Sequence, residues 1–96
     1  MNDRELYRQK KQAQLDEWKA DIDKLKARAS GNSAKAQLEL HKDIKKLEGR
    51  MEEGKAKLAE IAHASEDKWE SIKDGVESAW DSIKSAFKDA AARFKD

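Results

Sequence analysis

The chain has 96 residues, of which 43% are charged and 38% hydrophobic, with a net charge of +1 and neither cysteine nor proline. This composition is typical of long solvated helices or a coiled coil, and the periodic apolar residues argue against the disorder that so much charge could otherwise produce. The lack of cysteine excludes disulfides and thiolate zinc sites. Basic and acidic residues are mixed along the whole chain, so we expect no nucleic-acid partner.

The first predicted helix spans residues 3–29, and either Asn2 or Asp3 can cap it. Its apolar residues recur at alternating steps of three and four, which is the spacing of a narrow coiled-coil seam. This seam consists of Leu15, Trp18, Ile22 and Leu25 and continues to Ala29, and Tyr7 extends it upstream.

A helix–helix turn is expected at Ser30-Gly31-Asn32-Ser33. Gly31 can adopt the left-handed conformation that ends a helix, and Asn32 or Ser33 can cap the next helix. The alternative is a continuous helix that tolerates Gly31 at a cost of about 1 kcal/mol.

The second predicted helix spans residues 34–63 and has the most regular seam. Gly54 lies within this seam and leaves a gap, which Tyr7 could fill if the first two helices form an antiparallel hairpin. The seam residues are Leu40, Ile44, Leu47, Met51, Leu58 and Ile61.

The third predicted helix spans residues 66–95, with Ser65 as its cap. Its sequence nearly repeats after eleven residues, because Trp69, Ser71, Ile72 and Lys73 recur as Trp80, Ser82, Ile83 and Lys84. Eleven residues make three helical turns, so each unit restores the same face. The result is an apolar stripe about 140° wide. The stripe includes Trp69, Ile72, Val76, Trp80, Ile83, Phe87 and Phe94.

Three helices of similar length, each roughly 40–45 Å long, fit an up-down-up arrangement. The predicted fold is therefore all-α, with a single domain over residues 1–96. It consists of three long antiparallel amphipathic helices, a hairpin plus a third helix, in a coiled-coil-like bundle that stands alone or oligomerises. Antiparallel alignment about Ser65 sets Trp69 near Ile61 and Val76 near Gly54. The rival is an unbroken helix from residue 34 onward, with the eleven-residue step from Leu58 to Trp69 absorbed as a stutter.

Glu60 and His63 have the Glu-x-x-His spacing of di-metal centres in helical bundles. Such a centre needs a second copy of the motif, but the other histidine, His41, follows Leu38 at that spacing. A surface glutamate beside a boundary histidine is the preferred interpretation. The chain also has neither a nucleophile turn nor a glycine-rich phosphate loop. We therefore expect no enzyme activity, metal, cofactor or small-molecule substrate.

The apolar stripe is the feature of the sequence that bears on function. Its preferred interpretation is the core of a bundle or oligomer. Lys73, Lys84 and Lys95 flank it on one side. Flanking lysines can extend beside an apolar face that lies in a lipid headgroup layer, and this charge order resembles that of apolipoprotein-like and desiccation-protective helices. The excess of acidic over basic residues after residue 64 weakens attraction to anionic lipid.

Three segments carry a resemblance over nearly the full length: MNDRELYRQKKQAQLDEW, DIDKLKARA and the run from Trp69 to Trp80. Gln14-x-x-x-Trp18 and the paired tryptophans are the most specific of these motifs. The chain resembles a family of short bacterial coiled-coil domain proteins, some of which are described as stress-response proteins. The resemblance implies a non-enzymatic, cytoplasmic helical protein and supplies no catalytic residues.

Two functional hypotheses follow. The leading one is a non-enzymatic protein that acts by self-association or by binding another helical protein. The alternative is a protein that binds a membrane surface peripherally through the helix at residues 66–95. The expected location is the cytoplasm, because the amino terminus lacks the apolar segment of a secretory signal and no apolar run approaches the roughly 18 residues of a membrane span.

Overall fold

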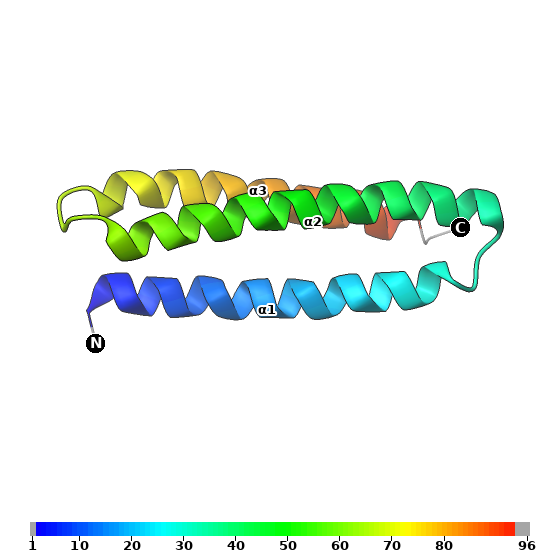
Figure 1. Ribbon diagram of the computed structural model, residues 1–96, viewed down its shortest axis with the longest axis horizontal. Helices are drawn as coiled ribbons and strands as arrows, with labels where there is room; N and C mark the ends of the chain where they lie inside the picture. The colour runs from blue at the N-terminus through cyan, green and yellow to red at the C-terminus, as the bar shows by residue number, and fades with distance from the viewer. Residues whose placement is uncertain (1, 94–96) are drawn as a thin grey trace.

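The structure, a computed structural model, describes residues 2–93 and contains three long helices in that range (Figure 1). These are α1 (Asp3–Ala29), α2 (Ala34–His63) and α3 (Trp69–Arg93). Consecutive helices run antiparallel and form a rod of 51 × 20 × 18 Å (Figure 1). The predicted all-α antiparallel bundle is confirmed.

Helices α1 and α2 begin and end at the predicted residues because their caps form as expected. The Asn2 side chain accepts a hydrogen bond from the Glu5 amide, and the Ser33 side chain accepts one from the Ala36 amide. Each cap satisfies a backbone donor that has no partner within its own helix.

The turn between α1 and α2 forms without the left-handed glycine that was predicted. Gly31 has a negative φ, as does every residue that the structure describes. Ser30 is still helical, with φ −63° and ψ −20°, and the Gly31 amide donates to the Arg28 carbonyl at 3.2 Å. Side-chain amides also donate to carbonyls of the turn: Asn32 donates to Arg28, and Gln37 donates to both Ser30 and Asn32. The carbonyls of Ala27 and Arg28, which a left-handed glycine terminus would use as acceptors, accept instead from the Ser30 hydroxyl and from the Asn32 side chain.

Helix α3 begins at Trp69, three residues after the predicted start at residue 66. Ala64 is extended, with φ −79° and ψ 151°, and the Ser65 carbonyl accepts hydrogen bonds from the Lys68 and Trp69 amides at 3.0 and 3.1 Å. Residues 66–68 therefore form a turn that leads into the helix. The alternative of one unbroken helix from residue 34 onward is wrong. The predicted end at residue 95 lies outside the described residues.

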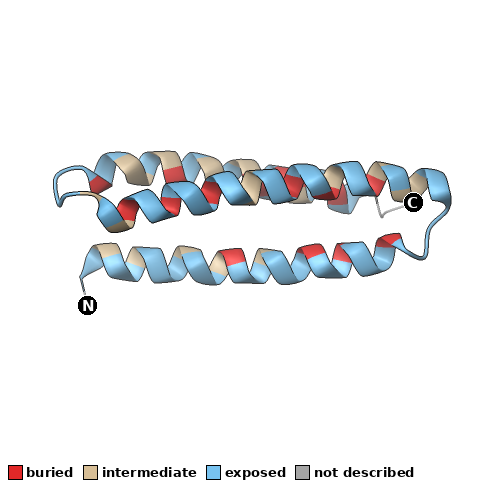
Figure 2. Ribbon diagram, viewed as in Figure 1, coloured by how far each residue is buried: buried red, intermediate tan, exposed pale blue. Residues whose placement is uncertain are grey.

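Buried residues occur along all three helices (Figure 2). Most of them form two clusters, and each cluster takes residues from all three helices. The cluster near the α2–α3 turn contains both tryptophans of the repeat, and the cluster near the α1–α2 turn contains smaller side chains. The first comprises Leu15, Leu58, Ile61, Trp69, Val76, Trp80 and Ile83, and the second Ile22, Leu25, Ile44, Leu47, Ala86 and Ala90.

Gly54 faces a different neighbour from the one predicted. A Cβ atom at Gly54 would lie 3.0 Å from Cζ3 of Trp80 and 3.2 Å from Cδ1 of Ile83, so these side chains fill the gap that Tyr7 was expected to fill. The non-helical segment after His63 shifts the register away from a centre at Ser65, and the indole of Trp80 is large enough to reach Gly54. Tyr7 packs against Trp69 instead, with ring centroids 6.2 Å apart.

Candidate functional site: the aromatic face of α3

The tryptophans at equivalent positions of the two eleven-residue units of α3 are both buried. Trp69 and Trp80 are 7% and 1% exposed, and Val76 and Ile83 are fully buried. Ile72 and Phe87 are half-buried at the edges of the stripe. Phe94, the last predicted member, lies outside the described residues. The stripe is therefore covered by the chain's own helices in this structure.

The predicted seam residues of α1 and α2 also lie in the core. Trp18 and Met51 are half-buried there. The buried seam residues are Leu15, Ile22, Leu25, Leu40, Ile44, Leu47, Leu58 and Ile61.

Helix α1 reaches α3 mainly through aromatic rings. We call Trp69, Trp80 and Phe87 the aromatic face of α3. Tyr7 packs on Trp69, and Trp18 packs on both Trp80 and Phe87, with centroids 5.8 and 6.0 Å apart. The backbones of α1 and α3 lie farther apart than those of α2 and α3, so these large rings span the distance (Figure 1). The two most specific sequence motifs thus meet at this face.

A polar cluster of Tyr7, Lys11, Lys73 and Glu77 lies at the edge of the aromatic face. The Tyr7 hydroxyl and Lys11 Nζ donate to the two carboxylate oxygens of Glu77 at 3.0 and 3.1 Å. Lys11 Nζ lies 5.4 Å from the ring centroids of both Tyr7 and Trp80, and Lys73 Nζ lies 5.2 Å from that of Tyr7. A cation over a ring contributes about 0.5–1 kcal/mol at an exposed site. The cluster therefore stabilises the packing of the first half of α1 on α3.

The polar cluster shifts the pKa values of two of its members in opposite directions. Partial burial disfavours ionisation of Glu77, but hydrogen bonds from Lys11 and Tyr7 and the charges of Lys11 and Lys73 outweigh it, so the pKa of this carboxyl is lowered. Burial raises the pKa of the Tyr7 hydroxyl, and its hydrogen bond to the Glu77 carboxylate raises it further. The ionised Glu77 and the neutral Tyr7 therefore stabilise each other.

One polar side-chain atom of α1 and one of α3 are buried without partners. The Trp80 Nε1 donor and the Gln14 Oε1 acceptor are both buried, and neither has a hydrogen-bond partner among the described residues. A buried donor or acceptor left unpaired costs about 1–3 kcal/mol. The Trp80 indole is thus buried in the bundle without a partner for its N–H group.

The first half of α1 is held more weakly than the rest of the bundle. The buried residues of α1 start at Leu15 and are otherwise Ile22, Leu25 and Ala29. Upstream of Leu15, the polar cluster and Arg4 make the contacts. Arg4 donates to the Ala64 carbonyl and forms an ion pair with Glu66 at 3.5 Å.

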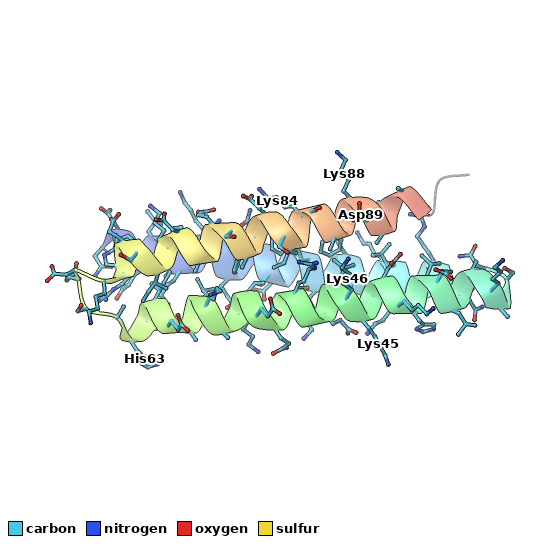
Figure 3. The ribbon with its side chains drawn as sticks, turned by 90° about the horizontal axis from the view of Figure 1, so that it is seen from above. Lys45, Lys46, His63, Lys84, Lys88 and Asp89 are labelled. Carbon is cyan, nitrogen blue, oxygen red and sulfur yellow. The ribbon has the colours of Figure 1, made fainter. Side chains whose placement is uncertain are left out.

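The Glu60–His63 pair lies on the surface, as the sequence indicates. Both residues are exposed and line a shallow groove with Ala56 and Ala59. His63 points away from the neighbouring helices, as do the labelled Lys45 and Lys88 (Figure 3). The part of the chain that the structure describes has no cluster of three His, Asp or Glu side chains arranged to hold a metal ion.

Sequence reasoning missed Lys11 and Glu77 as contact residues. Nothing in its own helix distinguishes Glu77 from the other acidic residues of α3, although its carboxylate accepts hydrogen bonds from Tyr7 and Lys11 at the edge of the stripe. The spacing of Tyr7, Lys11, Gln14 and Trp18 was the available signal, since steps of four, three and four place these residues on one side of α1.

Comparison with known proteins identifies the repeat but not the whole chain. A family model described as TMP repeat matches residues 69–79 and 80–90, which are the two eleven-residue units of α3. The matched residues make up less than a quarter of the chain. Neither a curated protein nor a solved structure matches it. Among the described helices, none combines the length and the apolar character needed to cross a bilayer.

Proposed function

We propose that this chain is a non-enzymatic interaction protein whose aromatic face on α3 binds a helix, either from a second copy or from another helical protein. The observation that carries the proposal is that this face already holds a helix, α1, across aromatic rings and an exposed polar cluster. The occupant of a helix-binding face is thus part of the same chain, and another helix can compete with it.

The balance of contacts favours release of α1 over separation of α2 from α3. Helix α2 contributes six buried residues along its length, Leu40, Ile44, Leu47, Gly54, Leu58 and Ile61. The first half of α1 depends on partly exposed ion pairs such as Lys11–Glu77, whose side chains are 13% and 48% exposed. Pairs of this kind are worth about 0–1 kcal/mol. The unpaired Trp80 Nε1 further lowers the stability of the state in which α1 covers the aromatic face.

The resemblance to short bacterial coiled-coil proteins supports a stress-related role for this binding in the cytoplasm. The TMP-repeat match supports the choice of α3 as the binding helix, because the match falls on the two units that form the aromatic face.

The test is competition by α1 supplied as a separate peptide. A fluorescent peptide of residues 2–29 is titrated with the full chain, and binding is followed by anisotropy. Lys11→Ala in the chain weakens its own α1, so the unchanged peptide should bind that variant about three- to tenfold more tightly than the parent. Lys10→Ala, which alters the neighbouring exposed lysine, serves as the control and should leave affinity unchanged. Absence of peptide binding to either protein at about 1 mM would overturn the proposal.

A lipid surface is the second candidate occupant. The observation that favours it is the position of Lys73, whose Nζ lies 5.7 Å from the centre of the Trp69 ring at the edge of the stripe. A lysine so placed can reach headgroups while the indole enters the acyl boundary. Because α1 covers the face, Lys11→Ala should increase the fraction bound to vesicles in a flotation assay. Equal flotation of parent and variant would count against this occupant.

A further inference from the structure

We infer that a second copy of this chain supplies the competing helix, by exchange of α1 through a straightened turn at Ser30–Ser33. In the exchanged dimer, α1 and α2 of each chain form one long helix, and each α1 covers the aromatic face of the partner. This inference rests on the proposed function, because it requires that the aromatic face accept a helix from another chain.

The backbone of the turn already lies close to a helix. Ser30 has helical angles, and the Gly31 and Asn32 amides donate to the carbonyls of Arg28 and Ala29 in the preceding turn. Ser33 is extended, with φ −61° and ψ 160°. No described residue has a positive φ, so straightening needs a change of ψ at Ser33 but no passage from the left-handed region.

The buried residues before and after the turn would lie on the same face if α1 and α2 formed one continuous helix. Ala29 and Leu40, the buried residues on either side, are eleven positions apart. Eleven residues place them about 20° apart around a continuous helix. Ser33 and Ala36 fall on the same side of that helix and are small enough for two such helices to pass each other closely. A straightened chain therefore keeps one apolar face from Leu15 to Ile61.

Side chains hold the turn closed, and they do so at the surface. Gln37 Nε2 donates to the Ser30 and Asn32 carbonyls at 3.2 and 2.9 Å, and Asn32 Nδ2 donates to Arg28 at 3.1 Å. In a continuous helix, backbone hydrogen bonds replace these contacts. A short connection gives the chain's own α1 an effective concentration in the millimolar range. Exchange should therefore be seen in concentrated protein, after warming and cooling.

Two substitutions separate the closed and exchanged states. Ala34→Pro is compatible with the closed turn, because Ala34 is the exposed first residue of α2 and Ser33 already has the extended conformation that precedes proline. The same proline cannot lie inside a continuous helix, so dimer formation should weaken more than about 100-fold. Gln37→Ala removes the side chain that closes the turn and should strengthen dimer formation about fivefold.

A distance within one chain distinguishes exchange from simple association. The chain has no cysteine, so spin labels can be attached at Gln12→Cys and Glu52→Cys, two exposed positions that line one groove between α1 and α2. In the closed chain the labels are neighbours. In a continuous helix they are about 60 Å apart. Pulsed electron paramagnetic resonance, with labelled chains diluted in unlabelled ones, measures this separation, and sedimentation gives the mass.

The expected result is a dimer with the long intrachain distance in the parent, more of it in Gln37→Ala, and a monomer with the short distance in Ala34→Pro. A dimer of Ala34→Pro as strong as that of the parent would overturn exchange while leaving self-association intact. Monomers throughout, at about 1 mM, would also overturn exchange. The binding of the separate α1 peptide would still decide the proposed function in either case.

Discussion

Alanine at Gly54 and alanine at Gly49 should change the stability of this protein in opposite directions. Both glycines lie inside α2, where replacement by alanine adds about 0.5–1 kcal/mol through helix propensity alone. A Cβ at Gly49 meets no atom within 4 Å, so Gly49→Ala should show that full gain. A Cβ at Gly54 lies 3.0 Å from Trp80, which is 1% exposed, so the indole would have to shift within the core. Overpacking of this kind costs about 1–3 kcal/mol.

The expected outcome for Gly54→Ala is therefore a net loss of up to about 2 kcal/mol, and the two variants should differ by about 1–3 kcal/mol. Urea denaturation followed by circular dichroism at 222 nm measures both free energies of unfolding under the same conditions. Equal stabilisation by the two alanines would show that Trp80 does not pack on Gly54, and it would refute the register between α2 and α3.

Two further predictions concern the polar cluster and the core. The pKa of Glu77 is lower in the folded than in the unfolded protein, so ionised Glu77 stabilises the fold. This stabilisation is complete at a pH above the usual pKa of a glutamate, and it is lost as the pH falls through the lowered pKa of the folded state. Glu77→Gln should thus destabilise by less than about 1 kcal/mol at neutral pH, and the melting curves of parent and variant should converge as the pH falls below the usual range for a glutamate. A difference that widens in acid would contradict the sign. Ile83→Asp places a charge at a side chain that is 0% exposed and should cost at least about 4 kcal/mol, with loss of most of the helical signal. Ser85→Asp, on the exposed side of α3, is its control, and a helical signal equally strong in both variants would contradict the packing.

The helices and their partition into a bundle could be predicted because local signals agreed with the hydrophobic pattern. Asn2 and Ser33 cap where their side chains indicate, and the steps of three and four along α1 and α2 mark the residues that are buried. The eleven-residue repeat correctly identified the face of α3 that meets the other two helices. These features depend on spacing within one helix, which a sequence displays directly.

The contacts between helices could not be predicted as well as the helix boundaries and the buried faces. Gly31 was expected to end the helix in the left-handed conformation, but the side chains of Ser30 and Asn32 donate to the carbonyls of Ala27 and Arg28 that such an end would use. Pairing by residue number placed Tyr7 near Gly54, whereas the reach of the Trp80 indole decides what fills that gap. Side chains on a helix lean toward its amino terminus and extend several ångströms from the backbone. The register therefore depends on side-chain size and turn length together.

Tryptophan fluorescence tests the central claim most directly, namely that the chain's own helices cover the aromatic face of α3. In a Trp18→Phe variant only Trp69 and Trp80 emit, and they are 7% and 1% exposed. We expect blue-shifted emission in buffer that stays unchanged when zwitterionic or anionic vesicles are added. Red-shifted emission in buffer that turns blue only with vesicles would contradict it, because the stripe would then be open to water until lipid covers it.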